Sequence, residues 1–459
     1  MKKTVILLLI IICGALTASE RGMTTSEFNC EGPVLFPAPL TEAPVDPHFE
    51  ALSRTEWVNL YNWDFDVILP SRSQFGLRFR NYEPNFFLYS SVCDFPTIGT
   101  TAINKAPAWM RAELQNTLWH LSNDKLVDYC NLILSVSDPI IDEICFAIAY
   151  SSLEYLESDF ASPQLFLENA SCIYSIDQDL DYVSVVDHGS SLTDPNYYSS
   201  TQYFRKNAEG VTETVEVPRE IYYWYIVHPK LSDEIPAYID PSIVENNSNH
   251  NNNIADPPTG VFWRSWLYTV AEGDYPTLAD TLQQCTTLFN RNNEGGDAIR
   301  TIQWWINQTM GFTSNNERPH QPVRIYRKHI GRCGEYQDYT NAVARLALIP
   351  CTNITSVSTD HVWNEFWESE WVQWEPVNGY INTPLVYENG WGKVFGSVFE
   401  TRSDGYFTPV TERYSEGLAT INIRVVDQNQ VPVDGARVIL AIFETSPRLD
   451  TVGFTGNDG

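Results

Sequence analysis

The stretch GRCGEYQDYTNAVARLALIP at residues 331–350 constrains this chain more than any other. Gly331 and Gly334 flank a single cysteine, Cys333, and apolar residues then recur at helical spacing. The pattern predicts a helix from about Cys333 to Leu348, with the thiol in its first turn. Free N–H groups and the positive end of the helix dipole favour a thiolate there. Cys333 is therefore either a nucleophile or a buried core cysteine, and this segment favours neither.

A second segment, STDHVWNEFWESEWVQWEPVN at 358–378, alternates like a β-hairpin. If WESE forms the turn, His361 and Glu375 stand opposite each other on neighbouring strands, with their side chains on one face. A general base and the carboxylate that orients it need this arrangement. Taken singly, His361 is an ordinary polar residue at a strand start and Glu375 an ordinary solvated carboxylate. Together, after a cysteine at a helix start, they favour a Cys-His-Glu triad.

Metal chemistry is not expected from the sequence. Eight cysteines remain after the N-terminal segment, and they contain no C-x-x-C pair, which argues against a structural zinc site. DQDLD at 177–181 alternates like a calcium loop but lacks the glycine and the distal glutamate of one. We therefore expect no metal and no cofactor.

The net charge indicates which partners the protein can bind, and the N-terminal residues indicate its cellular location. The net charge is −29, with 29 basic against 58 acidic residues, so nucleic acid and anionic membranes are unlikely partners. Lys2 and Lys3, a short apolar run and ALTAS form a secretory signal peptide over residues 1–18. We expect a secreted, extracytoplasmic protein that does not insert into the membrane after signal removal.

The remaining pattern predicts a helical and mixed N-terminal region, a catalytic core and a C-terminal strand module. The expected divisions are 1–18, 19–290, 291–416 and 417–459, with 19–290 supporting the core. Helices are predicted at 106–121, 139–157, 277–290 and 296–310, and a loop at 246–260. Strands are predicted at 421–426 and 436–443, followed by a turn at the end.

These motifs resemble the transglutaminase-like superfamily, and within it the catalytic core of peptide:N-glycanase. The resemblance spans about 331–415 and rests on GRCGEY, Arg345, TDHVWNE, PLVYENGWGK and, more weakly, VTERYS. It implies an α+β, papain-related fold. It also implies Cys333 as nucleophile, His361 as general base and acid, and Glu375 as the orienting acid, where the family usually has Asp. The segment 417–459 resembles part of a carboxypeptidase regulatory-like β-sandwich module.

Two departures concern the substrate. The paired zinc motifs of the glycanase are missing, and Cys351-Thr352 follow Pro350 where the family has Ala-Arg. The resemblance implies a cysteine hydrolase that acts on amide bonds of a protein, peptide or glycopeptide through a thioester. A peptidase or general amidase ranks slightly above an N-glycanase, and amine transfer ranks third. The alternative class is a non-catalytic module that binds protein or glycan.

Three tryptophans are candidate substrate contacts. Trp363 shields the base, stacks on a sugar or peptide, or simply packs in the hairpin. Trp304 or Trp305 supplies a second oxyanion donor, unless both belong to the helix core.

Overall fold

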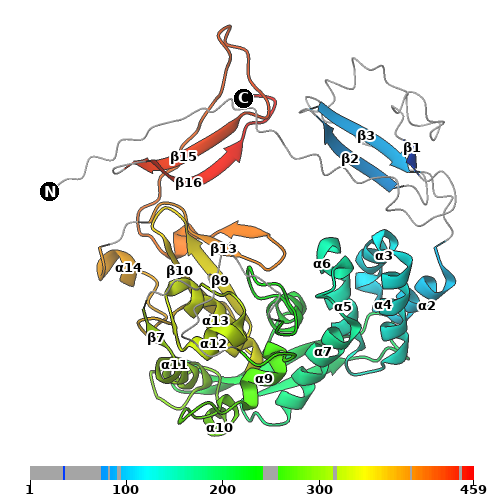
Figure 1. Cartoon of the computed structure of the whole chain (residues 1–459). Coiled ribbons are helices and arrows are strands. Elements are labelled where there is room, and N and C mark those ends of the chain that lie inside the picture. The colour runs from blue at the N-terminus through cyan, green and yellow to red at the C-terminus, as the bar shows by residue number, and fades with distance from the viewer. Residues whose placement is uncertain are drawn as a thin grey trace. The chain divides into compact units, whose positions relative to one another are not determined.

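The computed structural model describes residues 95–240, 257–313, 318–392, 395–443 and 447–459, and the backbone of three strands within 35–89. The chain divides into two compact units, of which the larger is Thr97–Leu418. The smaller joins Ala419–Gly459 to the segment up to Pro96. Helices and antiparallel sheets together confirm the predicted α+β class (Figure 1). The predicted signal peptide and residues 246–256 of the predicted loop lie outside the described residues.

Two small sheets form the described part of the smaller unit. One has the strand order β1–β3–β2, and the other is the antiparallel hairpin β15–β16. Their bounds are β1 (Leu35–Phe36), β2 (Gln74–Arg80), β3 (Glu83–Tyr89), β15 (Arg437–Phe443) and β16 (Pro447–Phe454).

The C-terminal strands differ in part from the prediction. The strand predicted at 436–443 is β15, but the one at 421–426 is wrong, since only a single bridge, Val426 to Pro432, forms there. A tight turn causes this, because the Asp427 carboxylate accepts the N–H groups of Asn429 and Val431 at 2.7 and 2.9 Å. The strand β16 up to Phe454 was not predicted, and the predicted turn follows it, where Gly459 N–H donates to Gly456 O at 2.9 Å. The wider β-sandwich stays a prediction.

A helical array begins the larger unit. Its elements are α2 (Thr97–Lys105), η4 (Ala108–Met110), α3 (Arg111–His120), α4 (Asn123–Ser135), α5 (Ile141–Ala149), α6 (Leu153–Glu157) and α7 (Pro163–Asp177). The two helices predicted here are confirmed, but the second divides into α5 and α6. The Ser152 hydroxyl accepts the Tyr155 N–H at 3.2 Å and so begins a new helix.

A three-stranded sheet and short helices follow. They are β4 (Val183–His188), β5 (Tyr198–Lys206), β6 (Thr212–Glu216), α8 (Arg219–Tyr222), η5 (Tyr223–Val227), α9 (Trp263–Thr269) and α10 (Leu278–Leu282). The helix predicted at 277–290 is wrong beyond Leu282. The chain there runs beside β5, because Leu288 N–H donates to Phe204 and Lys206 N–H donates to Phe289. Pairing with a neighbouring strand has overridden a helical pattern.

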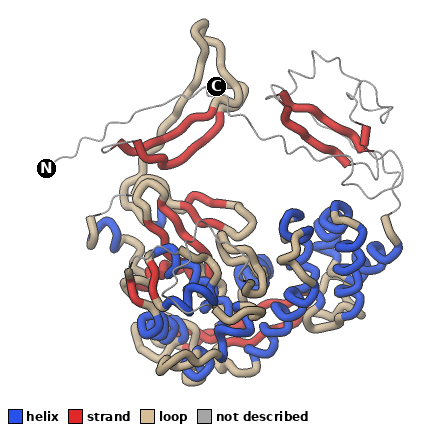
Figure 2. Tube along the Cα trace, viewed as in Figure 1, coloured by secondary structure: helices blue, strands red, loops and turns tan. Residues whose placement is uncertain are grey.

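The last part of the larger unit holds a six-stranded sheet with the order β12–β11–β10–β9–β13–β14. Helices lie beside its strands, which are red in Figure 2. The elements are α11 (Ala298–Thr309), β7 (Gly311–Phe312), α12 (Pro322–Lys328), β8 (Ile330–Gly331), α13 (Cys333–Leu346), β9 (Cys351–Ser356), β10 (His361–Trp367), β11 (Trp371–Glu375), β12 (Tyr380–Ile381), α14 (Val386–Asn389), β13 (Phe399–Thr401), β14 (Phe407–Pro409) and η6 (Thr411–Arg413). The helix predicted at 296–310 is confirmed as α11.

Helix α13 is the buried centre of this part, and it packs on β9 and β10. A polar stripe at four-residue spacing holds it there. Gln337 donates to the carbonyls of Ile354 and Trp363 at 2.8 and 2.5 Å. Asn341 donates to Leu231 O and to Asn353 Oδ1 at 3.1 and 3.0 Å. These bonds fix the rotation of the helix against the sheet, because each pairs a buried polar group with a defined partner.

Arg345 ends the stripe and ties α13 to two other segments. Its guanidinium is buried and donates to the carbonyls of His228, Lys230 and Cys351 at 3.1–3.3 Å. The helix ends as α13 at Leu346, two residues earlier than predicted, since Leu348 adopts a left-handed φ of 55°.

The turn of the β10–β11 hairpin is also anchored. Glu368 is fully buried there and forms ion pairs with Arg205 at 3.0 Å and Arg291 at 2.6 Å. Arg205 comes from β5 and Arg291 from the segment that runs beside it. The N-terminal part of the larger unit therefore holds the hairpin in place.

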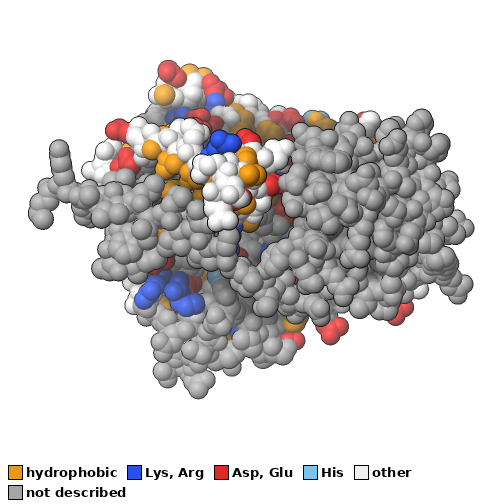
Figure 3. All heavy atoms as spheres, turned by 90° about the horizontal axis from the view of Figure 1, so that it is seen from above, with side chains coloured by type: hydrophobic (Ala, Val, Ile, Leu, Met, Phe, Trp, Pro, Cys, Tyr) orange, Lys and Arg blue, Asp and Glu red, His pale blue; other side chains and the backbone are white. Residues whose placement is uncertain are grey.

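The described surface carries charges of both signs. On the face shown in Figure 3, acidic and basic side chains lie among hydrophobic and polar ones. Within the described ranges, no helix has the length and apolar character to cross a bilayer.

Replacing Arg345 with Met tests this framework. We expect the free energy of unfolding to fall by about 3 kcal/mol, because buried carbonyls lose their donor. Lys206→Met is the control, since Lys206 pairs with Glu294 at the surface and should cost at most about 0.5 kcal/mol. Denaturant unfolding measures both, and equal losses would contradict a special role for Arg345.

Candidate active site

Cys333 is the first residue of α13, and its surroundings explain why the helix starts there. The backbone N–H of Arg332 donates to Glu335 Oε2 at 2.9 Å, so the helix's own third residue caps its beginning. Gly331 makes room for this cap, since a Cβ at that position would stand 2.5 Å from Glu335 Cβ. The Cys333 side chain is half-buried at this helix end.

His361 is the first residue of β10, and its ring faces Cys333. Cys333 lies four residues before Gln337, just over one helical turn, so the thiol shares the face that packs on β10. The side chain of Cys333 is hydrogen-bonded to His361, and the backbone N–H of Val362 also donates to its sulfur. His361 itself is only 8% exposed.

Glu375 ends β11 and completes the constellation. Its Oε2 lies 2.9 Å from His361 Nε2, so the imidazole bridges the carboxylate and the thiol. Glu375 is fully buried. The structure therefore brings together the three residues that the sequence singled out.

The predicted hairpin is confirmed, but its register is wrong by two residues. Asn364 pairs with Trp374 and Trp367 with Trp371, so the turn centres on Ser369. Glu375 then lines up with Trp363, and His361 is its diagonal neighbour on the same face. A direct pair of His361 and Glu375 needs a turn centred on residue 368, whereas the strand pairing centres it one residue later.

The site favours ionisation of the thiol. Burial raises the pKa of Cys333, but the hydrogen bond and charge of His361 and the N–H of Val362 outweigh burial and lower it. The carboxylate of Asp360 opposes this lowering. The net result is a pKa below the ordinary value of a cysteine, which is the condition for a reactive thiolate.

Aromatic rings enclose the imidazole. Trp363 is fully buried and stacks on His361 with ring centroids 5.3 Å apart, and Tyr387 and Trp391 approach edge-on at 5.6 Å. Trp363 also packs in a core cluster with Phe395 and others. Trp363 therefore shields the base from one side, and stacking of Trp363 on a sugar or peptide is wrong, since its ring has no exposed surface.

Trp305 does not reach the site. Its ring is fully buried between Tyr326 and Tyr339, each 5.7 Å away, and its Nε1 donates to Pro276 O at 2.7 Å. The predicted roles of Trp305 in substrate binding and as a second oxyanion donor are therefore wrong. An amphipathic helix placed one of two adjacent tryptophans in the core.

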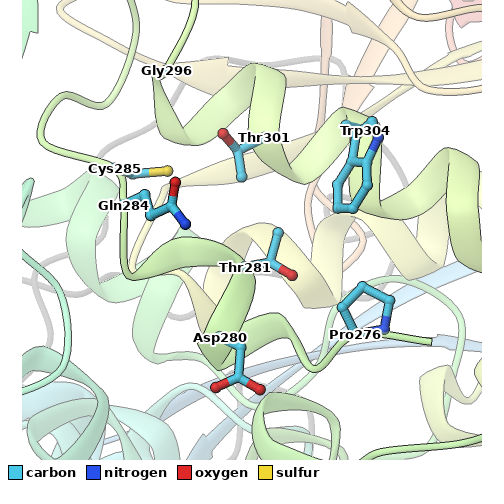
Figure 4. A pocket seen from close by; sticks show the side chains of 8 residues that line it. All are labelled: Pro276, Asp280, Thr281, Gln284, Cys285, Gly296, Thr301 and Trp304. Atoms are coloured by element: carbon cyan, nitrogen blue, oxygen red, sulfur yellow. The ribbon is translucent and has the colours of Figure 1, made fainter. Parts of the chain in front are cut away.

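Trp304 lies on the outer face of α11 and is 50% exposed. Its indole and Pro276 border a groove of about 410 Å³ between α10 and α11 (Figure 4). Asp280, Thr281, Gln284, Cys285, Gly296 and Thr301 form the rest of the lining. Neither Cys333 nor His361 lines this groove, so a contact of Trp304 with substrate stays a prediction.

Two further residues of the site were missed from the sequence. The Tyr387 hydroxyl lies 3.0 Å from Glu375 Oε2, and Gln373 Nε2 lies 3.1 Å from that hydroxyl. Tyr387 is in the PLVYENGWGK motif, but the motif gave it no role. Gln373 had a signal in the strand alternation, because it is a polar residue two positions before Glu375.

Glu335 and Glu365 tie elements together. Glu335 forms an ion pair with Arg318, and Glu365 pairs with Arg413 and accepts the Tyr414 hydroxyl. Both carboxylates are buried, so each stabilises a junction beside the site: the start of α13 in one case and β10 against η6 in the other.

The described residues contain no group of three or more His, Cys, Asp or Glu side chains placed to hold a metal ion. The six cysteines in the described part of the chain are free thiols. Cys30 and Cys93 lie outside the described residues.

Comparison with known proteins agrees with this geometry. Residues 281–376 match the family model of the transglutaminase-like superfamily. Peptide-N(4)-(N-acetyl-beta-glucosaminyl)asparagine amidase of Caenorhabditis elegans is 33% identical over 155 residues, which cover 31% of this chain and 24% of that protein. The Arabidopsis thaliana amidase of the same name is 30% identical over 107 residues, 23% of this chain and 15% of that protein. The human one is 29% identical, again over 107 residues and 16% of its length.

The chain thus spans a quarter or less of the length of these relatives. The family model begins fifty residues before the first motif that resembles the family, and so includes α11.

The pH dependence of alkylation tests the lowered pKa. Iodoacetamide should modify Cys333 at pH values where an ordinary thiol is still protonated, and His361→Ala should move the reaction to higher pH. Cys172 is an internal control, because burial raises the pKa of its thiol. Peptide mass spectrometry reads both cysteines in one sample. A Cys333 that titrates together with Cys172 would contradict the site as described.

Proposed function

We propose that this protein is a secreted cysteine-dependent amide hydrolase that acts on N-glycosylated peptides or proteins through a thioester. The observation that carries the proposal is a pair of hydrogen bonds. One joins Cys333, at a helix start, to His361, and the other joins His361 Nε2 to Glu375 Oε2 at 2.9 Å. The sequence ranked a general peptidase slightly higher. The relatives' shared name, an asparagine amidase, now favours the N-glycanase reaction.

The first half of the reaction forms the thioester. The Cys333 thiolate attacks the side-chain amide carbon of a glycosylated asparagine, and a tetrahedral oxyanion forms. The free N–H groups of the first turn of α13 are candidate donors to this oxyanion. His361 Nδ1 then gives its proton to the departing nitrogen, the C–N bond breaks and a glycosylamine leaves.

The second half uses water. His361 Nδ1 removes a proton from water, and the hydroxide attacks the thioester carbon. The C–S bond breaks, an aspartate side chain is released, and the Cys333 thiolate is restored with the imidazolium beside it. Glu375 holds the proton on Nε2 throughout and stabilises the imidazolium. Trp363 closes one face of the imidazole to water.

Two other functions use the same groups. Hydrolysis of a backbone amide needs only a different acyl group at Cys333, and transfer needs an amine in place of water. A non-catalytic module that binds protein or glycan would need none of this chemistry. A lowered thiol pKa has no use in such a module, which is why we place hydrolysis first. The predicted signal peptide over 1–18 leads us to place the reaction outside the cytoplasm.

Incubation with an N-glycosylated peptide under reducing conditions tests the proposal. We expect the glycosylated asparagine to become aspartate, a mass change read directly by mass spectrometry. Cys333→Ala should lose at least about a thousandfold in rate, since it removes the nucleophile. Cys172→Ala is the matched control, because it removes another free thiol on α7 and should keep full activity.

Backbone cleavage that depends on Cys333 would replace the N-glycanase by a peptidase. Activity equal in Cys333→Ala and the unchanged protein would overturn the nucleophile assignment. A peptide left intact, but bound equally well by both, would establish the non-catalytic module.

A further inference from the structure

A series of hydrogen bonds continues beyond Glu375, and the donor in each of them can be assigned. We propose that Gln373 and Tyr387 are positioning residues that hold the Glu375 carboxylate where it accepts the N–H of His361 Nε2 and leaves Nδ1 for Cys333. This inference rests on the proposed function for its consequence in catalysis. Its geometry and its test on the thiol stand independently of any substrate.

The series of hydrogen bonds begins at a backbone N–H, which can only donate. The N–H of Thr383 donates to Gln373 Oε1 at 2.9 Å. A backbone N–H is a donor only, so the amide oxygen of Gln373 must face Thr383. Asn382 helps to place this N–H, since its own N–H donates to Gln373 O at 2.9 Å and its φ is 56°, which asparagine adopts readily.

The donor and the acceptor of the next two hydrogen bonds follow from this orientation of Gln373. Because its oxygen faces Thr383, Gln373 presents its NH₂ group to Tyr387 and donates to the hydroxyl oxygen at 3.1 Å. The Tyr387 hydroxyl accepts this bond, and its one proton points to Glu375 Oε2 at 3.0 Å. Gln373 is 3% exposed and Tyr387 is fully buried, so water does not compete for these positions.

The carboxylate of Glu375 determines which nitrogen of the imidazole is the donor. A carboxylate only accepts, so His361 Nε2 must donate to Oε2, and Nδ1 is left for Cys333. Both donors meet on the same oxygen. Among the described residues, Oε1 of Glu375 is buried with no hydrogen-bond partner.

The Tyr387 hydroxyl is a second donor to Glu375, and it restrains a side chain that is longer than aspartate. Glutamate has one more rotatable bond than the aspartate usual in the family, so a single bond from His361 leaves its carboxylate more freedom. Tyr387 removes that freedom, because two donors from different elements, β10 and α14, fix one oxygen.

The tyrosine ring is held independently of its hydroxyl. It packs against Trp363 and Phe395, with centroids 4.8 and 5.2 Å away, in the core cluster that also contains Tyr414. Tyr387→Phe therefore removes one hydrogen bond and leaves the packing in place. Tyr414→Phe is a matched control, since its hydroxyl also bonds a buried carboxylate, that of Glu365, in the same cluster.

Several titratable groups face His361 and shape any pH profile. Cys333 from α13, Glu375 from β11 and Tyr387 from α14 contact the imidazole, and the charges of Asp360 and Arg318 act near the thiol of Cys333. Tyr387 stays protonated, because burial raises its pKa well above the ordinary value. Tyr387→Phe thus changes no charge, and any shift in the profile reports the hydrogen bond.

The test measures Cys333 alkylation by iodoacetamide against pH in Tyr387→Phe, Glu375→Gln and the double variant. We expect Tyr387→Phe to move the profile to higher pH and to slow the reaction at pH 6 on the order of tenfold. In the Glu375→Gln background the same change should have almost no further effect, since Tyr387 acts through that carboxylate. Tyr414→Phe should leave both profiles unchanged.

The outcomes separate the possibilities. Equal effects of Tyr387→Phe with and without Glu375→Gln would overturn the proposal and make Tyr387 a packing residue. So would a shift of the same size in Tyr414→Phe. A Tyr387→Phe profile that matches the unchanged protein would also overturn it. None of these readings needs a substrate, so the proposed amidase can fail in the glycopeptide assay while this inference holds, and the reverse.

Discussion

Everything at this site depends on how α13 is locked against β9 and β10. The helix is buried on nearly all sides, so its polar residues must find partners inside the protein. Gln337, Asn341 and Arg345 do so at four-residue intervals along one face, and Cys333 begins the same row. Because the partners are backbone carbonyls at fixed positions, the helix can neither rotate nor slide.

The hairpin that carries His361 and Glu375 is fixed at its opposite end. The pair of arginines on Glu368 ties the turn to the β5 region. Between these two anchors, the hydrogen bonds of β10 and β11 place the imidazole and its carboxylate. This explains why the segment 97–290 accompanies the catalytic part: it supplies Arg205 and the carbonyls of His228 and Lys230 that Arg345 binds. That residues 19–290 as a whole support the catalytic core, with a boundary at 290, stays a prediction.

The lowered pKa of Cys333 depends on the groups that surround its thiol. Burial alone would raise the pKa of Cys333, as it does for Cys172, which is also half-buried. Only Cys333, among the cysteines in the described ranges, has both an imidazole and a backbone donor on its sulfur. The difference among these thiols is therefore one of neighbours rather than of depth, and the neighbours come from a strand about thirty residues further on.

The sequence by itself determined what is local: the helix that starts at Cys333, the hairpin after it and the one-face relation of His361 and Glu375. These follow from glycine placement and from periods of 3.6 and 2, which neighbouring residues specify. Tertiary structure alone decided the rest. The turn centre at Ser369 depended on strand pairing, and the burial of Trp305 but not Trp304 depended on which face of α11 met Tyr326. The end of α10 depended on β5. The link from Thr383 through Gln373 and Tyr387 to Glu375 joins residues from a loop, a strand and a helix, and no spacing in the sequence encodes a hydrogen bond between elements whose packing is not yet known.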